Sequence, residues 1–232
     1  MTPEFTPTAR RFGIASAVSV AVLQGAYAAT LIVGFLALES PEQPIGEPMF
    51  TILEVLILAM TPAMVALMVA VHAWAPAHAR TWSLAAVVFM GVLAGVTSSV
   101  HFVVLTLSRR PEVVELAARP LLMTFEWPSV AYALDILAWD VFFALSMLFA
   151  APVFGGGRLA TSIRVLMITS GGLALAGLGG VATGDMSLRN VGIVGYLGVF
   201  LIVVILLAVL FFRTEPVEAS PDEGGTPSRR TA

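Results

Sequence analysis

Four ionisable residues lie inside apolar segments of the chain, where a charge is costly and a chemical role is common. Glu54 lies in FTILEVL, His101 in SSVHFVV, and Asp135 and Asp140 in ALDILAWD. A charge at the centre of a membrane-spanning helix costs about 2.5–3.5 kcal/mol on insertion scales, so such a residue normally faces the bundle interior and a partner. Because carboxyl groups and imidazole serve as general acids and bases, all four are candidate catalytic residues.

The spacing of the two aspartates limits how they can act together. Asp135 and Asp140 are five residues apart, which places them about 140° apart around an α-helix. They cannot both point at one small ligand unless the helix is distorted. The sequence therefore leaves open whether both aspartates serve one site or whether one of them bonds to a neighbouring helix.

Five further residues are candidate substrate-binding groups. Glu126 lies at the mouth of the segment that carries the aspartates, and Trp139 lies between them in the chain, where it could pack or shape an apolar cavity. Gln24 and Tyr27 fall near the middle of the first apolar segment. Arg189, in GDMSLRN, could either cover a pocket or tie two helix ends together.

Composition excludes several kinds of chemistry. The chain has no cysteine, so disulfides and thiolate catalysis are excluded, and it has no lysine, since all twelve basic residues are arginine. Schiff-base chemistry is therefore excluded as well. The chain contains no phosphate-binding loop, nucleophile elbow or dinucleotide fingerprint. Its three histidines lack the spacing of a zinc or haem site, so no metal or cofactor is expected. No nucleic-acid partner is expected either.

The overall composition is typical of a membrane protein. Hydrophobic residues make up 58% of the 232 residues and charged residues 12%, with a mean hydropathy of +0.94, against about 45–50% apolar and 25% charged in soluble proteins. A bilayer-spanning helix needs roughly 20 apolar residues. Apolar segments of that length predict an all-α bundle of six transmembrane helices, at Phe12 to Leu38, Met49 to Ala75, Trp82 to Leu107, Pro128 to Phe154, Thr161 to Ala182 and Asn190 to Phe212.

The arginines predict an orientation. With the N-terminus inside, eight of the twelve arginines face the cytoplasm, the side that positive residues favour. We expect a cell-membrane protein with a cytoplasmic segment 1–11, a transmembrane domain 12–213, and a disordered cytoplasmic tail 214–232 that is rich in proline and glycine. The segment Arg109 to Pro120 has charged and apolar residues on different faces, which predicts a short amphipathic surface helix between helices three and four.

Small residues recur every four positions in two of the expected helices. Gly91, Gly95 and Ser99 do so in the third helix, and Gly172, Ala176 and Gly180 in the fifth. We expect these stripes to allow close helix packing.

The buried polar residues suggest a pocket. At a rise of about 1.5 Å per residue, Glu54, His101, Glu126 and Asp135 fall in the same half of the membrane, with Asp140 just below them. We expect Glu54, His101 and Asp135 to meet in one cavity, because buried polar groups at one depth supply the partners that the others need.

Three kinds of function remain open. The protein could be a membrane-embedded acid–base enzyme on an apolar small molecule such as an isoprenoid, terpenoid or other lipid, since carboxyl groups in an apolar pocket can stay protonated and act as general acids. It could instead be a non-catalytic membrane subunit or sensor whose acids fix helix packing. It could also be a proton-coupled transporter of an ion or small molecule, although no inverted repeat supports this. The sequence leaves the oligomeric state open.

Overall fold

The computed structural model describes residues 5–40 and 43–215, and these form helices connected by short links with no strand among them. Six helices are long and apolar enough to span a membrane, which makes the chain a polytopic membrane protein with an all-α fold. We number them as spans one to six: α1 (Pro7–Leu36), α2 (Met49–Trp74), η1–α3 (Ala77–Leu107), α6–η3 (Val130–Val153), α8–α9 (Arg158–Thr183) and η4–α11 (Met186–Arg213).

The first helix begins earlier than the apolar pattern indicated, at Pro7 instead of Phe12. Thr6 caps it, because the Thr6 side chain accepts a hydrogen bond from the Ala9 backbone N–H at 3.1 Å. Pro7 suits the first helical position, where its missing N–H is not needed. Part of the expected N-terminal segment is therefore helical. The expected disordered tail lies outside the described residues from position 216 onward.

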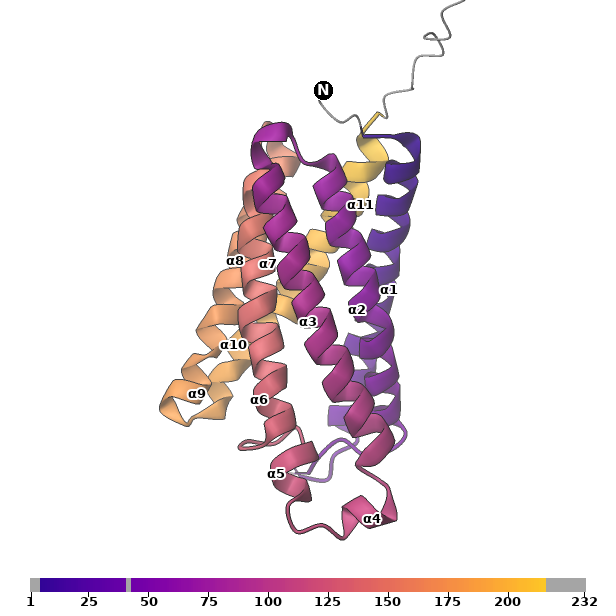
Figure 1. The fold of residues 1–232 in the computed structure, drawn as a ribbon, viewed down its shortest axis with the longest axis vertical. Helices are drawn as coiled ribbons and strands as arrows, with labels where there is room; N and C mark the ends of the chain where they lie inside the picture. Colours follow the sequence, from indigo (N-terminus) through magenta and orange to yellow (C-terminus); the bar gives the residue numbers. More distant parts are fainter. Residues whose placement is uncertain (1–4, 41–42, 216–232) are drawn as a thin grey trace, which may run out of the picture.

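The six spans pack in chain order, each against the next (Figure 1). Within span six, α11 (Phe200–Arg213) also packs against α1, which closes the ring at the end of the bundle where α1 begins and α11 ends. We call this the terminal end. The opposite end carries α4 (Pro111–Val114) and α5 (Arg119–Met123), and we call it the loop end.

The amphipathic segment after α3 (Arg80–Leu107) is not one helix. It forms the two short helices α4 and α5, separated by residues 115–118. A continuous helix would require the backbone N–H of residue 120 to bond to Leu116, and Pro120 has no N–H to donate. The expected surface helix is therefore interrupted. Its apolar side chains Val114, Leu116 and Leu121 remain more than half exposed.

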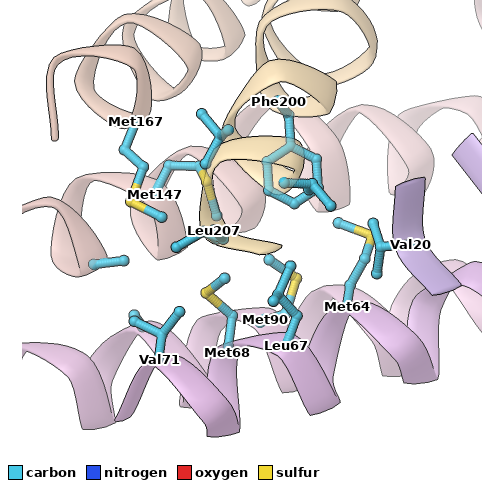
Figure 2. Close-up of a cluster of buried hydrophobic side chains, with 14 of the residues drawn as sticks. Val20, Met64, Leu67, Met68, Val71, Met90, Met147, Met167, Phe200 and Leu207 are labelled. Carbon is cyan, nitrogen blue, oxygen red and sulfur yellow. The ribbon is translucent and has the colours of Figure 1, made fainter. Parts of the chain in front are cut away.

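A dry core closes the bundle toward the terminal end. Figure 2 shows methionine, leucine and valine side chains meeting from several spans, including Met64, Leu67 and Met68 of α2. Methionine fills irregular space between helices well. The core residues drawn with them are fully or almost fully buried: Val20, Val71, Met90, Met147, Met167, Phe200 and Leu207.

The stripes of small residues lie differently from the expectation. A Cβ added at Gly91, Gly95 or Gly172 would meet nothing within 4 Å, so these glycines do not mediate close helix contacts. Gly180 of the fifth-helix stripe does lie in a close contact, since a Cβ there would lie 3.3 Å from the Arg189 backbone nitrogen, but the tightest contacts involve other glycines. A Cβ at Gly195 would lie 2.7 Å from the Ser170 carbonyl oxygen, so spans five and six lie in close contact at this position.

Two spans contain π-helical segments. In span four, η2 (Leu137–Phe143) separates α6 (Val130–Ile136) from α7 (Ala144–Ala150). In span six, η5 (Val194–Val199) separates α10 (Asn190–Ile193) from α11. Bonding from residue i to i+5 widens the helix and changes which residues share a face. Both segments lie beside the candidate site.

Candidate functional site

The centre of the site is His101 of α3, which bridges two carboxylates from other helices. Its Nδ1 lies 2.8 Å from Oε2 of Glu54 in α2, and its Nε2 lies 3.4 Å from Oδ1 of Asp135 in α6. The Phe125 ring stacks on the imidazole with a centroid distance of 4.8 Å. The expected meeting of Glu54, His101 and Asp135 is therefore confirmed as geometry, while their catalytic role stays a prediction.

Arg189 extends this chain of contacts into span six. Its Nη2 donates to Oδ2 of Asp135 at 3.0 Å, and its Nε lies 3.4 Å from Oδ2 of Asp140. The Arg189 side chain is only 6% exposed, so both ion pairs are buried. Five ionisable residues from four spans thus form one network, which we call the buried charge cluster: Glu54, His101, Asp135, Asp140 and Arg189.

The π-helix resolves the spacing of the two aspartates. In a regular α-helix Asp135 and Asp140 would lie on different faces. The η2 segment begins at Leu137, between the two, and its i to i+5 bonding brings residues five apart toward one face. Both carboxylates can therefore contact the single guanidinium of Arg189. The π-helical segment is thus the helix distortion that both aspartates need to serve one site, a possibility that the sequence left open.

The turn before α10 sets the position of Arg189. Arg189 ends η4 (Met186–Arg189), and Asp185 caps this turn by accepting hydrogen bonds from the Ser187 backbone N–H at 3.0 Å and hydroxyl at 2.7 Å. These hydrogen bonds from Ser187 lower the pKa of Asp185 below its ordinary value. The Tyr132 ring lies 4.5 Å from the guanidinium carbon of Arg189, a distance suited to a cation–π contact.

Asp140 lies in a space that two glycines create. A Cβ at Gly192 would lie 3.0 Å from Asp140 Oδ1, and one at Gly177 would lie 3.3 Å from Oδ2. The Asp140 side chain is completely buried, and Oδ1 has no hydrogen-bond partner among the described residues. An unpartnered buried oxygen is costly. Asp140 is held in place by close packing against the two glycines and by one long contact to Arg189.

A cavity of about 1230 Å³ adjoins the cluster and extends from the loop end to the middle of the bundle. It is larger than the roughly 300–1,000 Å³ of typical small-molecule pockets. Its walls are mostly apolar, and Glu54, His101, Asp135 and Arg189 all line it. Asp135 has the most exposed carboxylate of these, at 13% against 5% for Glu54, so it is the acid best placed to touch a bound molecule.

The deep wall of the cavity contains three of the sequence candidates. Gln24 of α1 donates through Nε2 to the carbonyl oxygens of Tyr196 at 2.9 Å and Leu197 at 2.8 Å, in the π-helical segment of span six. We call this contact the Gln24 clasp. Gln24 Oε1 is buried and has no partner among the described residues. Tyr27 and Trp139 also line the cavity, and the Trp139 ring lies 5.2 Å from that of Tyr196.

The loop-end mouth of the cavity is polar. Glu126 lines it and is exposed, in contrast to the buried members of the charge cluster. Arg109 pairs with Glu47 and donates to Thr51 at 3.1 Å, while Arg119 donates to the Ser108 carbonyl at 2.9 Å. The cavity therefore has an apolar interior, a charged inner wall and a polar rim.

Sequence reasoning found most of these residues but missed how two of them act. Arg189 was expected to cover a pocket or tie helix ends, whereas its side chain is buried as the counter-ion of two aspartates. Gln24 was expected to bind substrate, whereas its amide nitrogen binds backbone carbonyls. Tyr132, Tyr196 and Phe125, which pack on the cluster, were not singled out, and nothing in the sequence marks them except their nearness to Asp135 or Arg189.

The cluster has more acids than bases. A neutral imidazole carries one N–H, so two hydrogen bonds from His101 to two carboxylates require either an imidazolium or a protonated carboxyl group. Three acids also face two bases. Even with His101 protonated, one negative charge is in excess, and an uncompensated buried charge is strongly disfavoured. The buried charges of the cluster therefore balance only when His101 is protonated and one of the three acids is neutral.

The comparisons add no family to this picture. No protein-family model, no curated protein and no solved structure matches the chain. What the fold and the site define is a six-span membrane protein with a buried acid–base cluster on the wall of an intramembrane cavity.

Proposed function

We propose that the protein is a membrane-embedded acid–base enzyme that transfers protons to and from a lipid-soluble small molecule. The observation that carries this proposal is His101, which bridges Glu54 and Asp135 at the wall of a large apolar cavity. A shared proton beside an apolar binding space is the arrangement that general acid–base catalysis requires. An isoprenoid, terpenoid or similar lipid is the substrate class that the apolar walls favour.

The roles within the cluster follow from burial and contact. Asp135 is the most exposed carboxylate and is assigned the proton transfer to substrate. His101 and Glu54 lie behind it and are assigned the relay that returns its proton. Arg189 holds one Asp135 oxygen at 3.0 Å, which leaves the other oxygen to share a proton with His101. Trp139 and Tyr27 shape the apolar wall.

The other two kinds of function are less well supported. A transporter needs a path to both ends, and the packed core around Met68, Met90 and Leu207 closes the bundle below the cavity. A purely structural role for the acids would bury them between helices. Glu54, His101 and Asp135 are largely buried, but each of them also lines the cavity.

Solvent deuterium offers a test that works before the substrate has been identified. The purified protein in lipid nanodiscs is incubated in D2O with a lipid extract of the organism that encodes it, and the extract is examined by mass spectrometry. Proton transfer to carbon would incorporate deuterium into a lipid-soluble species. Asp135→Asn keeps the side-chain shape and removes the proton, so it should lower the rate by about 10²–10⁴-fold, the usual contribution of general acid–base catalysis.

The control is Glu112→Gln, which changes an exposed carboxylate that does not line the cavity and should alter incorporation far less. Correct folding of each variant is checked by its elution from a sizing column and its helical circular dichroism. Equal incorporation by the native chain and Asp135→Asn, or none by either, would contradict the proposed enzyme activity.

A further inference from the structure

Spans one and six do not pack on each other along their whole length. At the terminal end α1 packs along α11, but α1 makes no comparable packing with α10 or η5. The loop-end half of span six lies well away from α1 in Figure 1. The Gln24 clasp joins the two helices where their close packing ends. Spans one and six are thus joined in one half and separate in the other.

The exposed side chains among the cavity-lining residues indicate where the cavity opens. Among the described cavity-lining residues of the six spans, the exposed ones belong to spans one and six: Phe35 at 58%, Val194 at 57%, and Asn190 at the start of α10. The lining residues of spans two to four are buried or half-buried, such as Glu54 and His101. A side chain that both lines a cavity and is exposed marks the edge of an opening. Phe35 and Val194 are apolar and lie within helices apolar enough to span a membrane, so their part of the edge suits contact with lipid, while Asn190 lies toward the polar loop end.

We infer that the cavity takes its ligand sideways from the bilayer, between α1 and the α10–η5 part of span six, and that the ligand is a membrane lipid with an apolar chain. The apolar edge and the volume of about 1230 Å³ fit an acyl or isoprenoid chain. The polar rim at the loop end suits the headgroup of the same molecule, since Arg109, Arg119 and Glu126 lie there. The Gln24 clasp sets the inner limit of the opening.

This inference rests on the proposed function only in making that lipid the substrate. Occupancy of the cavity is a binding property, and it can be measured without turnover. The two ideas can therefore fail separately.

Trp139 is a natural probe, because it lines the cavity yet is only 5% exposed. A chain with Trp74, Trp82 and Trp127 replaced by phenylalanine keeps Trp139 as its sole tryptophan. It is reconstituted into phosphatidylcholine vesicles in which one acyl chain is dibrominated near its middle. Bromine quenches tryptophan only near contact, so a chain that enters the cavity should quench Trp139. A chain that keeps only Trp82, which is 49% exposed, gives the reference for contact with bulk lipid.

Narrowing the opening should remove this quenching. Leu31→Phe with Val194→Phe enlarges one lining residue on each side of the opening, and Val194→Phe alone serves if the pair does not fold. Ile32→Phe with Val191→Phe is the matched control, because these neighbours are exposed and do not line the cavity. The expected result is quenching of Trp139 comparable with that of the Trp82 reference, lost in the narrowed chain and kept in the control.

Two results would overturn the inference. One is Trp139 fluorescence that brominated lipid leaves unchanged while aqueous acrylamide quenches it, which would mean access from water at the loop end. The other is equal lipid quenching in the narrowed and control chains. Lipid quenching without deuterium incorporation would instead reject the enzyme activity alone and leave the side opening in place.

Discussion

Removal of the Arg189 charge should destabilise the fold strongly, and the structure indicates by how much. Arg189 is the counter-ion of two buried carboxylates, at 3.0 Å from Asp135 and 3.4 Å from Asp140. Breaking a buried pair by removing one partner costs about 3–5 kcal/mol, because the other charge stays buried without compensation. Arg189→Met retains an unbranched side chain of similar reach, but it leaves Asp140 without a counter-ion and Asp135 with His101 alone.

A pair of double-mutant cycles divides this loss between the two aspartates. Asp140→Asn combined with Arg189→Met should cost less than the sum of the single changes, because the amide no longer needs a counter-ion. Couplings between residues in one ion-pair network are about 0.5–3 kcal/mol. The Asp135–Arg189 coupling should be the larger of the two, since that contact is shorter, at 3.0 Å against 3.4 Å.

Thermal unfolding in a mild detergent, followed by circular dichroism, gives the measurement. A loss of 3–5 kcal/mol should lower the midpoint by roughly 10 °C in a chain of this length. The exposed pair Arg109–Glu47 is the matched control, and Arg109→Met should cost no more than about 1 kcal/mol, as for other surface pairs. Couplings near zero for both aspartates, or a loss no greater than that of the control, would refute the interpretation of the cluster as a buried ion-pair network.

Two further predictions concern packing and topology. Gly195→Ala should destabilise by about 1–3 kcal/mol through overpacking, because its Cβ would lie 2.7 Å from the Ser170 carbonyl oxygen. Gly95→Ala meets open space and should be neutral or stabilising by up to about 1 kcal/mol; the opposite order in detergent unfolding would contradict the packing. A reporter fused after Phe212 should behave as cytoplasmic and one inserted in 40–48 as external, and the reverse result for both would invert the proposed orientation.

The six spans could be predicted from sequence because lipid leaves the backbone little choice. A spanning segment must satisfy its own hydrogen bonds, so apolar length alone identifies it. The ends could not be predicted as well. The helix ends depend on capping residues such as Thr6 before α1. They also depend on prolines such as Pro120, which prevents one continuous helix and is followed by a second short helix.

Depth also predicted that Glu54, His101 and Asp135 would meet, since polar groups buried at one level seek one another. Depth could not predict that the Arg189 side chain points into the bundle and pairs with two aspartates. An arginine near the end of a span normally reaches outward to water, and its inward direction here depends on the η4 turn. A Cβ at Gly180 would lie 3.2 Å from the Asp185 carbonyl oxygen and 3.3 Å from the Arg189 backbone nitrogen, so this turn packs closely on span five.

The glycines show what the spacing of residues in the sequence cannot predict. A four-residue repeat shows that small residues share a helix face, but not whether that face meets a helix or lipid. Gly91 and Gly95 lie on an open face. The glycines that matter to the site are Gly177 and Gly192, which lie on different spans and become neighbours of Asp140 only through the fold.

The position of Asp140 bears on why the cluster exists at all. Buried ion pairs are weak evidence for stability, because well-packed apolar residues of similar volume are often as stable or more so. Asp140 costs more folding free energy than a well-paired residue would, because one of its oxygens has no partner among the described residues and the other has one contact at 3.4 Å. It adds a negative charge that pairs with Arg189, and so moderates the pull of Arg189 on Asp135. Asp135 therefore shares Arg189 with Asp140 and contacts His101 through its other oxygen. Under the proposed function, this carboxyl group at the cavity wall is the one that gives and takes the proton.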